Sequence, residues 1–390
     1  MLLLKTAFKN ILGAGKRTWL NVTVLSFTFV LMVAYNGTID GWKLDARRET
    51  RLWETGAGQF WHPDYDRFDV FTLQDAHGLV PPTLQNCIQN GSLTPILVTQ
   101  GVIYPQGRMQ NVLIKGIDPE QDIVQIPTWE LRQNTDEITA ITGSRTAQSA
   151  RLQRGDRVML RWRDKNGAFD AKEILIAHVF ETKVPTVDIG QIWMDLTQLR
   201  QMTNMPLETT YLIASDRCPI YSDTDGWIHK DLKFLMADLD SMIRGNRVET
   251  IIIFSILLAI ALLAVFDTQT LSIFRRQREI GTYVALGMTP RRVTHLFTLE
   301  GTCFSLLSIL VSLVWGTPAM ALYAQIGYKM PKMVDDMGVV MGRVLYPVFQ
   351  PSSIFTSIVI VVGLSALISY LPTRKIAKQN VVEALKGKIV

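Results

Sequence analysis

The 390-residue sequence has few of the residues that build metal centres and disulfide frameworks, with three cysteines and five histidines. The histidines show no metal-ligand spacing and no Cys-x-x-Cys pair occurs, so the sequence predicts no metal site. Cys87 and Cys218 precede Cys303 and are 131 positions apart. Sequence alone leaves open whether Cys87 and Cys218 form a disulfide.

The sequence also lacks a complete catalytic motif. The stretch GAGKRT at 13–18 has Asn10 where a phosphate loop needs its first glycine, and Arg17 where it needs Ser or Thr. No nucleophile elbow occurs, and His62 in QFWHPDYDRFD is interpreted as part of an edge strand and loop. We therefore expect no catalytic residue and no cofactor on this chain.

Long apolar runs are present, and 48% of the residues are hydrophobic. Four runs reach the roughly 20 residues that a helix needs to cross the hydrocarbon of a bilayer. The predicted spans are 18–39, 248–272, 299–323 and 351–371. The first is too long for a cleaved signal sequence and is interpreted as an anchor.

The charges predict how these spans are oriented. Residues 1–17, 271–298 and 372–390 hold 14 Lys and Arg against two acidic residues, whereas the remaining sequence holds 26 basic and 33 acidic residues. Because basic loops stay in the cytoplasm, both termini and the loop 273–298 are expected there. Residues 40–247 then form a large outer domain, and 324–350 a short outer loop. The basic charge follows topology and does not indicate a nucleic-acid partner.

The N-terminal residues 1–17 place Leu4, Phe8 and Ile11 on one helical face, which predicts a helix in the cytoplasmic membrane interface. The outer domain alternates strand and helix patterns and is expected to be α+β. Strands are predicted at 93–104, 109–117 and 209–215, with a hairpin of 157–163 and 168–180 around Asn166-Gly167. Helices are predicted from Ser144, after Asp195 and from about Ile228 into the second span.

The third span carries small residues spaced four, three, four and four apart, which places them on one helical face. Small residues let helices approach closely in lipid, so this face predicts a helix–helix interface. Its members are Gly301, Ser305, Ser308, Ser312 and Gly316.

The loop between the second and third spans contains a short predicted helix at 277–286, with Ile280, Tyr283 and Val284 on one face. Gly287 is placed to end it. Thr289 and Pro290 then start a helix that continues into the third span. From these residues alone, an interfacial anchor and a mechanical coupler are equally supported.

This loop, RRQREIGTYVALGMTPRRVTHLFTLEG at 275–301, resembles the signature of MacB/FtsX-type ABC transporter permeases. The tail LPTRKIAKQNVVEALKGK at 371–388 is similar to the closing segment of that family. The stretch ITGSRTAQSARLQRGDRVML resembles part of its MacB-like periplasmic core domain. The order of spans and outer domain also matches the family's layout.

The resemblance implies a permease subunit that works as a homo- or heterodimer with a separate ABC ATPase, which binds ATP and Mg²⁺. ATP-driven movement would pass to the outer domain, a mode called mechanotransmission. The short helix would be the coupling helix, docking through its apolar face and oriented by its charges, while the tail residues Val382, Glu383 and Leu385 pack beside it. The coupling residues that the resemblance implies are Arg278, Glu279, Ile280, Gly281, Tyr283, Leu286 and Gly287.

Within that family, the sequence resembles the LolC/LolE branch in three features, namely its length, its lack of a fused ATPase and the stretch QFWHPDY. That branch implies release of lipoproteins from the bacterial inner membrane to a periplasmic carrier. Asp267 departs from the family, whose members often have Asn there. Export of another periplasmic substrate and FtsX-like control of a cell-wall hydrolase remain alternatives. A membrane sensor is disfavoured because no inner segment reaches thirty residues, and an anchored enzyme because the chain lacks catalytic motifs.

Overall fold

The computed structural model describes residues 16–132, 137–219, 222–330 and 340–377. The chain divides into two compact units. The helical unit comprises Met1–Lys43, Ile243–Lys329 and Val344–Val390, and the α+β unit comprises Leu44–Met242 and Met330–Arg343. Almost all of the predicted interfacial helix 1–17 lies outside the described residues, as do the tail residues Val382, Glu383 and Leu385.

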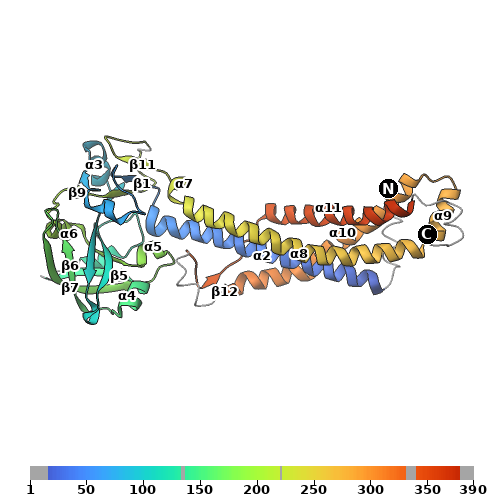
Figure 1. Ribbon diagram of the computed structural model, residues 1–390, viewed down its shortest axis with the longest axis horizontal. Coiled ribbons are helices and arrows are strands. Elements are labelled where there is room, and N and C mark those ends of the chain that lie inside the picture. The colour runs from blue at the N-terminus through green and yellow to red at the C-terminus, as the bar shows by residue number, and fades with distance from the viewer. Residues whose placement is uncertain (1–15, 133–136, 220–221, 331–339, 378–390) are drawn as a thin grey trace. The chain divides into compact units, whose positions relative to one another are not determined.

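Long helices dominate the helical unit (Figure 1). They are α2 (Lys16–Thr50), α8 (Ala237–Arg275), α10 (Pro290–Ile326) and α11 (Pro351–Ala377), with the short α9 (Gln277–Ala285) between α8 and α10. The strands β12 (Tyr328–Lys329) and β13 (Val344–Leu345) pair in antiparallel fashion between α10 and α11. Both α2 and α8 contribute residues to both units.

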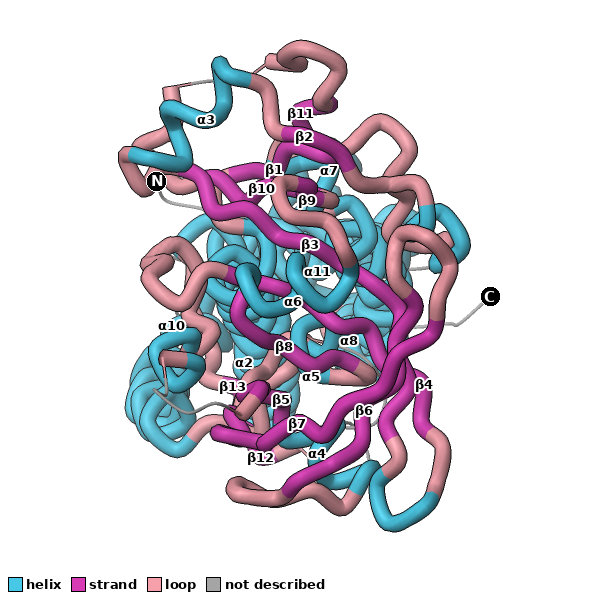
Figure 2. Tube along the Cα trace, turned by 90° about the vertical axis from the view of Figure 1, so that its left-hand side faces the viewer, coloured by secondary structure: helices cyan, strands magenta, loops and turns pink. Residues whose placement is uncertain are grey.

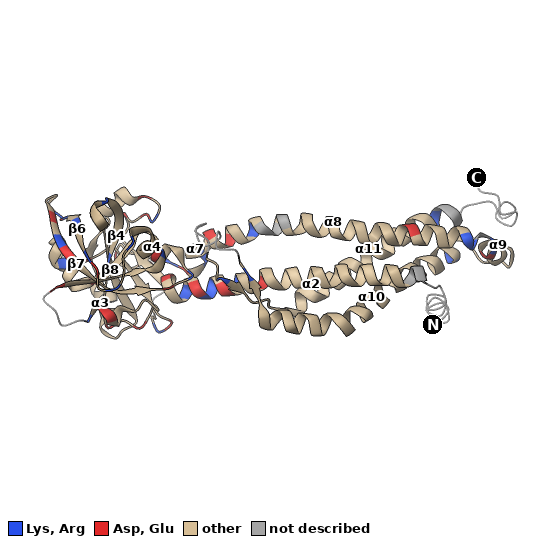
Figure 3. Ribbon diagram, turned by 90° about the horizontal axis from the view of Figure 1, so that it is seen from below, with Lys and Arg blue, Asp and Glu red and all other residues tan. Residues whose placement is uncertain are grey.

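Four described helices are long and apolar enough to cross a membrane. The candidate spans are Trp19–Thr55, Ala237–Arg275, Pro290–Ile326 and Pro351–Arg374. Residues 251–266, 301–326 and 351–373 contain no Asp, Glu, Lys or Arg, which leaves long tan stretches in Figure 3. A helix satisfies its own backbone hydrogen bonds, as hydrocarbon requires. These helices fit a multi-pass membrane protein.

The helix α2 continues to Thr50, beyond residue 39, where the predicted span ends. Residues 40–50 contain no proline, and Trp42, Ala46 and Thr50 recur every four positions and are buried. That spacing places one face of the extension against neighbouring residues, which favours helix over loop.

The small-residue face of α10 lies at contacts between helices. Ser312 Oγ is 2.9 Å from Ser26 Oγ of α2, and a Cβ added at Gly316 would lie 2.7 Å from Val30 Cγ2. A Cβ added at Gly301 would overlap the side chain of Ser369 in α11. All five predicted members of this face are buried, namely Gly301, Ser305, Ser308, Ser312 and Gly316.

The α+β unit contains a nine-stranded sheet in the order β11-β1-β10-β3-β4-β8-β5-β7-β6. Pairs β4–β8 and β5–β7 are parallel, and the other neighbours are antiparallel. The strands of this sheet are β1 (Gly58–Trp61), β3 (Leu93–Ile103), β4 (Gln110–Ile117), β5 (Ile138–Gly143), β6 (Arg157–Arg163), β7 (Phe169–Phe180), β8 (Gln191–Asp195), β10 (Tyr211–Ala214) and β11 (Ile228–Lys230).

Shorter elements complete this unit. A second small sheet pairs β2 (Gly78–Leu79) with β9 (Glu208–Thr209). The helices are α3 (Pro82–Gln89), α4 (Ser144–Ala150), α5 (Pro185–Asp188), α6 (Leu196–Thr203) and α7 (Leu232–Leu235). Single helical turns occur at η1 (Arg51–Thr55), η2 (Val70–Gln74), η3 (Pro105–Gly107) and η4 (Thr128–Leu131).

Strand β3 also pairs with β6, and this pairing closes six strands into a ring (Figure 2). One face of the ring strands is apolar and includes Ile114, Leu160, Trp162 and Ile192. Gly101 lies where β3 meets both β4 and β6, and a Cβ there would lie 2.5 Å from Ile114 Cδ1. The ring therefore closes around side chains that alternate along each strand.

The opposite strand face packs against a second core that includes Val98, Ile117, Ile141 and Trp193. Lys115 points to this face, is 9% exposed, and its Nζ lies 4.9 Å from the centroid of the Trp193 ring. Burial lowers the pKa of Lys115 to about 8, against an opposing effect of Glu54. A buried ammonium is thus part of an otherwise apolar core.

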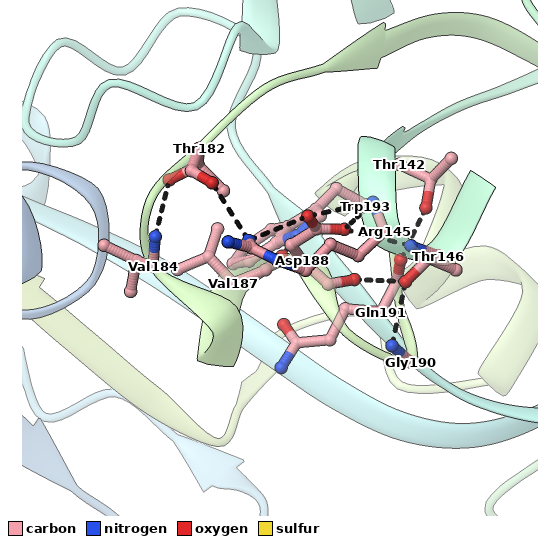
Figure 4. A network of polar contacts seen from close by, with 10 residues as sticks. All are labelled: Thr142, Arg145, Thr146, Thr182, Val184, Val187, Asp188, Gly190, Gln191 and Trp193. Atoms are coloured by element: carbon pink, nitrogen blue, oxygen red, sulfur yellow. Dashed lines mark hydrogen bonds and ion pairs between the residues drawn. The ribbon is translucent and has the colours of Figure 1, made fainter. Parts of the chain in front are cut away.

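Helix α4 begins at the predicted Ser144, but its cap comes from a distant residue. Asp188, completely buried, accepts hydrogen bonds from the backbone N–H groups of Arg145 and Thr146, each at 3.1 Å (Figure 4). The Arg145 guanidinium also donates to Asp188, at 3.3 Å, and to Thr182 O. A carboxylate at a helix start satisfies unpaired N–H groups and favours the helix dipole.

The predicted helix from about Ile228 is wrong. Residues 228–230 form β11, which pairs with β1 at the edge of the large sheet, and α8 starts only at Ala237. Asp231 accepts a hydrogen bond from Phe234 N and caps the short helix α7 instead. Pairing with a distant strand outweighs local helix propensity here. The predicted strand 209–215 is likewise divided between β9 and β10.

Candidate functional site

The loop between α8 and α10 is a compact structure made from local backbone signals. Helix α9 ends in a Schellman motif, in which Met288 N donates to Tyr283 O at 2.9 Å and Gly287 N donates to Val284 O at 3.0 Å. Gly287 has φ of +90°, a conformation that favours glycine. The predicted break at Gly287 is therefore present.

Helix α10 begins immediately after this break. Thr289 has the extended conformation of an N-cap residue and Pro290 occupies the first helical position, as the sequence predicts. The Thr289 side chain makes no capping hydrogen bond, whereas its carbonyl accepts hydrogen bonds from Arg292 N and Val293 N. The α9–α10 turn is consequently fixed through the backbone.

The apolar face of α9 packs inside the helical unit. Ile280 is 4% exposed and lies in a cluster with Ile273 of α8 and Val293 and Phe297 of α10. Tyr283, Val284 and Met288 pack against this cluster. The coupling residues Ile280 and Gly281 on this face are buried within the chain. The face therefore holds α9 to the two long helices.

Arg276, at the bend between α8 and α9, joins three elements by charge. Its Nε donates to Glu279 of α9 at 2.7 Å, and its Nη1 donates to Glu300 of α10 at 2.9 Å. The guanidinium carbon lies 5.0 Å from the centroid of the Phe297 ring. Burial acts to lower the pKa of Arg276, but both carboxylates outweigh it and the pKa is raised.

The outward surface of this loop carries one large apolar side chain among charged ones. Leu286 is 81% exposed, and Arg278 and Glu279 are exposed on α9. Arg291 and Arg292 are exposed at the start of α10. An exposed leucine with a surrounding set of charges is suited to contact a protein groove with complementary charge.

Sequence analysis missed Arg276 and its contact with Glu300. No spacing rule connects residues 24 positions apart in two helices. A carboxylate near the end of an apolar helix requires a partner, and this could have directed attention to the arginines at 275 and 276. In the described part of the chain, no group of three or more His, Cys, Asp or Glu side chains could hold a metal ion.

Residues 251–381 match the family described as FtsX-like permease C-terminal. This stretch is similar to FtsX-like permeases. It includes all of α9 and α10, and therefore the whole loop between α8 and α10. No curated protein matches the chain.

The match of residues 251–381 supports a relationship of this chain to the ABC transporter permeases. A permease of this family implies a membrane setting and an ABC ATPase partner. The four apolar helices agree with that setting. The loop between α8 and α10 lies within the matched residues, which makes it the candidate functional site.

Proposed function

We propose that the chain is the permease subunit of an ABC transporter and that it passes ATP-driven movement to its α+β unit. The observation that carries this proposal is the double attachment of α9, by the Ile280 cluster and by Arg276, to both α8 and α10. A force on α9 acts on two apolar helices at once, because the loop has little freedom to absorb it.

The ATPase would contact α9 from the cytoplasm. Leu286 inserts into its groove, Arg278 and Glu279 orient the contact, and Gly287 keeps the turn tight. Ile280, Gly281 and Tyr283 act by fixing α9 in place. ATP and Mg²⁺ are bound by the partner, and this chain contributes no catalytic group.

Movement reaches the α+β unit through α2 and α8, since each of these helices contributes residues to both units. In this proposal the protein spans the bacterial inner membrane with both termini in the cytoplasm, and the α+β unit is periplasmic. A second permease, identical or related, completes the dimer, and the small-residue face of α10 holds the helices of this chain together.

The substrate class we propose is lipoproteins, released from the inner membrane toward a periplasmic carrier and the outer membrane. The support is the resemblance of QFWHPDY and the overall chain layout to the LolC/LolE branch. Two alternatives use the same coupling, namely MacB-like export of another periplasmic substrate and FtsX-like control of a cell-wall hydrolase. They differ from lipoprotein release in what the α+β unit acts on.

The test is purification of the full-length chain from its native membrane in detergent. We expect an ABC ATPase to co-purify, and we expect Leu286→Asp to remove it while membrane insertion is retained. The matched control is Phe169→Asp, which also places a charge at an exposed apolar residue but on β7 of the α+β unit. Leu271 is exposed too, but it lies in an apolar span, so Leu271→Asp would disturb the membrane helix itself. A homogeneous, stable preparation without any nucleotide-binding subunit would contradict the proposal.

A further inference from the structure

The end of α2 that belongs to the α+β unit carries two carboxylates on one helical face. Asp45 and Glu49 are four positions apart, and two like charges at this spacing destabilise a helix. Lys183, which follows β7, contacts both of them. Its Nζ donates to the two carboxylate oxygens of Asp45 at 3.0 and 2.9 Å and to Oε1 of Glu49 at 3.1 Å. One ammonium from outside the helix therefore offsets a repulsion within α2.

The contact is partly shielded from water, and its charges are retained. The side chains of Glu49, Asp45 and Lys183 are 18%, 34% and 39% exposed. Burial acts to lower the pKa of Lys183, but hydrogen bonds to the two carboxylates outweigh it and the pKa is raised. Lys183 is thus protonated at neutral pH, and its three N–H groups match three acceptor oxygens.

The chain around Lys183 also holds η1, the turn that continues α2. Thr186 Oγ1 donates to Oε2 of Glu54 at 2.7 Å. The ring of Trp53 stacks on that of Phe180, with the centroids 5.8 Å apart. The stretch 180–186 therefore contacts the end of α2 and its continuation over about two helical turns.

The same stretch leads directly to β7 and to α4. Phe180 is the last residue of β7, which pairs with β5 and β6. The Arg145 guanidinium at the start of α4 donates to Thr182 O and to Asp188, the last residue of α5 (Figure 4). One short stretch of chain thus connects the end of α2 with a strand and a helix of the α+β unit.

We propose that Lys183 is a positioning residue that couples α2 to the sheet of the α+β unit. The inference rests on the proposed function, in which α2 carries ATP-driven movement, and it adds the contact through which the unit receives that movement. Without Lys183 the two carboxylates repel each other and the end of α2 opens locally. Movement of the helix is then absorbed by this opening and does not reach β7.

The first test uses the isolated full-length protein in detergent and measures backbone hydrogen exchange by mass spectrometry. In Lys183→Met, exchange in 45–54 should become about three- to tenfold faster, as expected for the loss of partly exposed ion pairs. Lys183→Arg keeps the charge and should restore slow exchange. Lys172→Met, at an exposed position of β7, is the matched control and should behave as wild type. Exchange in 45–54 that is unchanged in Lys183→Met, or that rises equally throughout the α+β unit, overturns the proposal.

The second test adds the partner ATPase and a slowly hydrolysed ATP analogue. We expect the analogue to change hydrogen exchange in 180–188 of the wild-type complex. In Lys183→Met this change should disappear, although the complex still hydrolyses ATP at the wild-type rate. Equal changes in the two proteins, whether large or zero, overturn the coupling role. Failure to recover an ATPase contradicts the proposed function alone, because the first test needs no partner.

Discussion

Nη1 of Arg276 lies 2.9 Å from Oε2 of Glu300, which links the α8–α9 bend to α10 through an acid that is 93% buried on its side chain. Removing one partner of a buried ion pair leaves the other charge without compensation. Arg276→Gln should therefore destabilise the helical unit by about 3 kcal/mol. It should also lower stimulation of the partner ATPase, since α9 loses part of its attachment.

Melting temperature in detergent and ATPase rate of the reconstituted complex measure these effects. Arg275→Gln is the matched control, because Arg275 is adjacent in sequence and exposed. If both variants behave alike, the contact with Glu300 has no role in coupling.

Gly287 has φ of +90° and no atom lies within 4 Å of a Cβ built on it. Space is therefore available, and the cost of Gly287→Ala is that of the backbone conformation alone, about 1–2 kcal/mol. We expect a looser α9–α10 turn and weaker ATPase coupling.

Gly363 in α11 provides the comparison. It also has open space around a Cβ, but its φ is ordinary for a helix. Gly363→Ala should be neutral or slightly stabilising because alanine favours helix. Equal losses of coupling in both variants would show that the turn geometry is unimportant.

Gly301 and Ser369 allow α10 and α11 to approach closely. Gly301→Ala should cost about 1–3 kcal/mol, because the added methyl overlaps the Ser369 side chain. Ser369→Gly removes the atoms that the added methyl would overlap. The double variant Gly301→Ala/Ser369→Gly should therefore lose less stability than the two single variants lose together. A thermal double-mutant cycle measures this coupling. Simple additivity would mean that the helices do not meet here.

Lys115 makes the stability of the α+β unit depend on pH. Its folded-state pKa of about 8 is below the ordinary value of 10.5, so burial of the charged form costs stability below pH 8. That cost should decline as pH rises from about 8 to 10.5, where the unfolded state also loses its proton.

Lys115→Met should raise stability at pH 7 by about 3 kcal/mol, and its difference from wild type should shrink toward pH 10. Urea unfolding followed by tryptophan fluorescence across this pH range measures the difference. Lys172→Met, on an exposed position of β7, is the control and should show no such trend. A constant difference across pH would contradict burial of the charge.

Local signals made much of the fold predictable. The hairpin of β6 and β7 follows from alternating residues around Asn166-Gly167, and the end of α9 follows from Gly287. The predicted strands at 93–104 and 109–117 agree with β3 and β4 within about a residue.

Features that depend on distant partners were not predictable in this way. Asp188 caps α4 from more than forty positions away, and β3 reaches β6 to close the ring. The Arg276–Glu300 contact is of the same kind, since it depends on how two helices meet. Such contacts are decided by packing, which a window of neighbouring residues does not contain.

The ion pair between Arg47 Nη2 and Asp240 Oδ1, 2.6 Å long, joins the two ends of the segment Leu44–Met242, which makes up most of the α+β unit. An insertion whose ends meet does not force apart the helices that it interrupts. The segment Leu44–Met242 could thus be exchanged for another fold, or replaced by a short turn, without redesign of α2 and α8. A lineage could change what such a protein recognises while keeping the same membrane machinery.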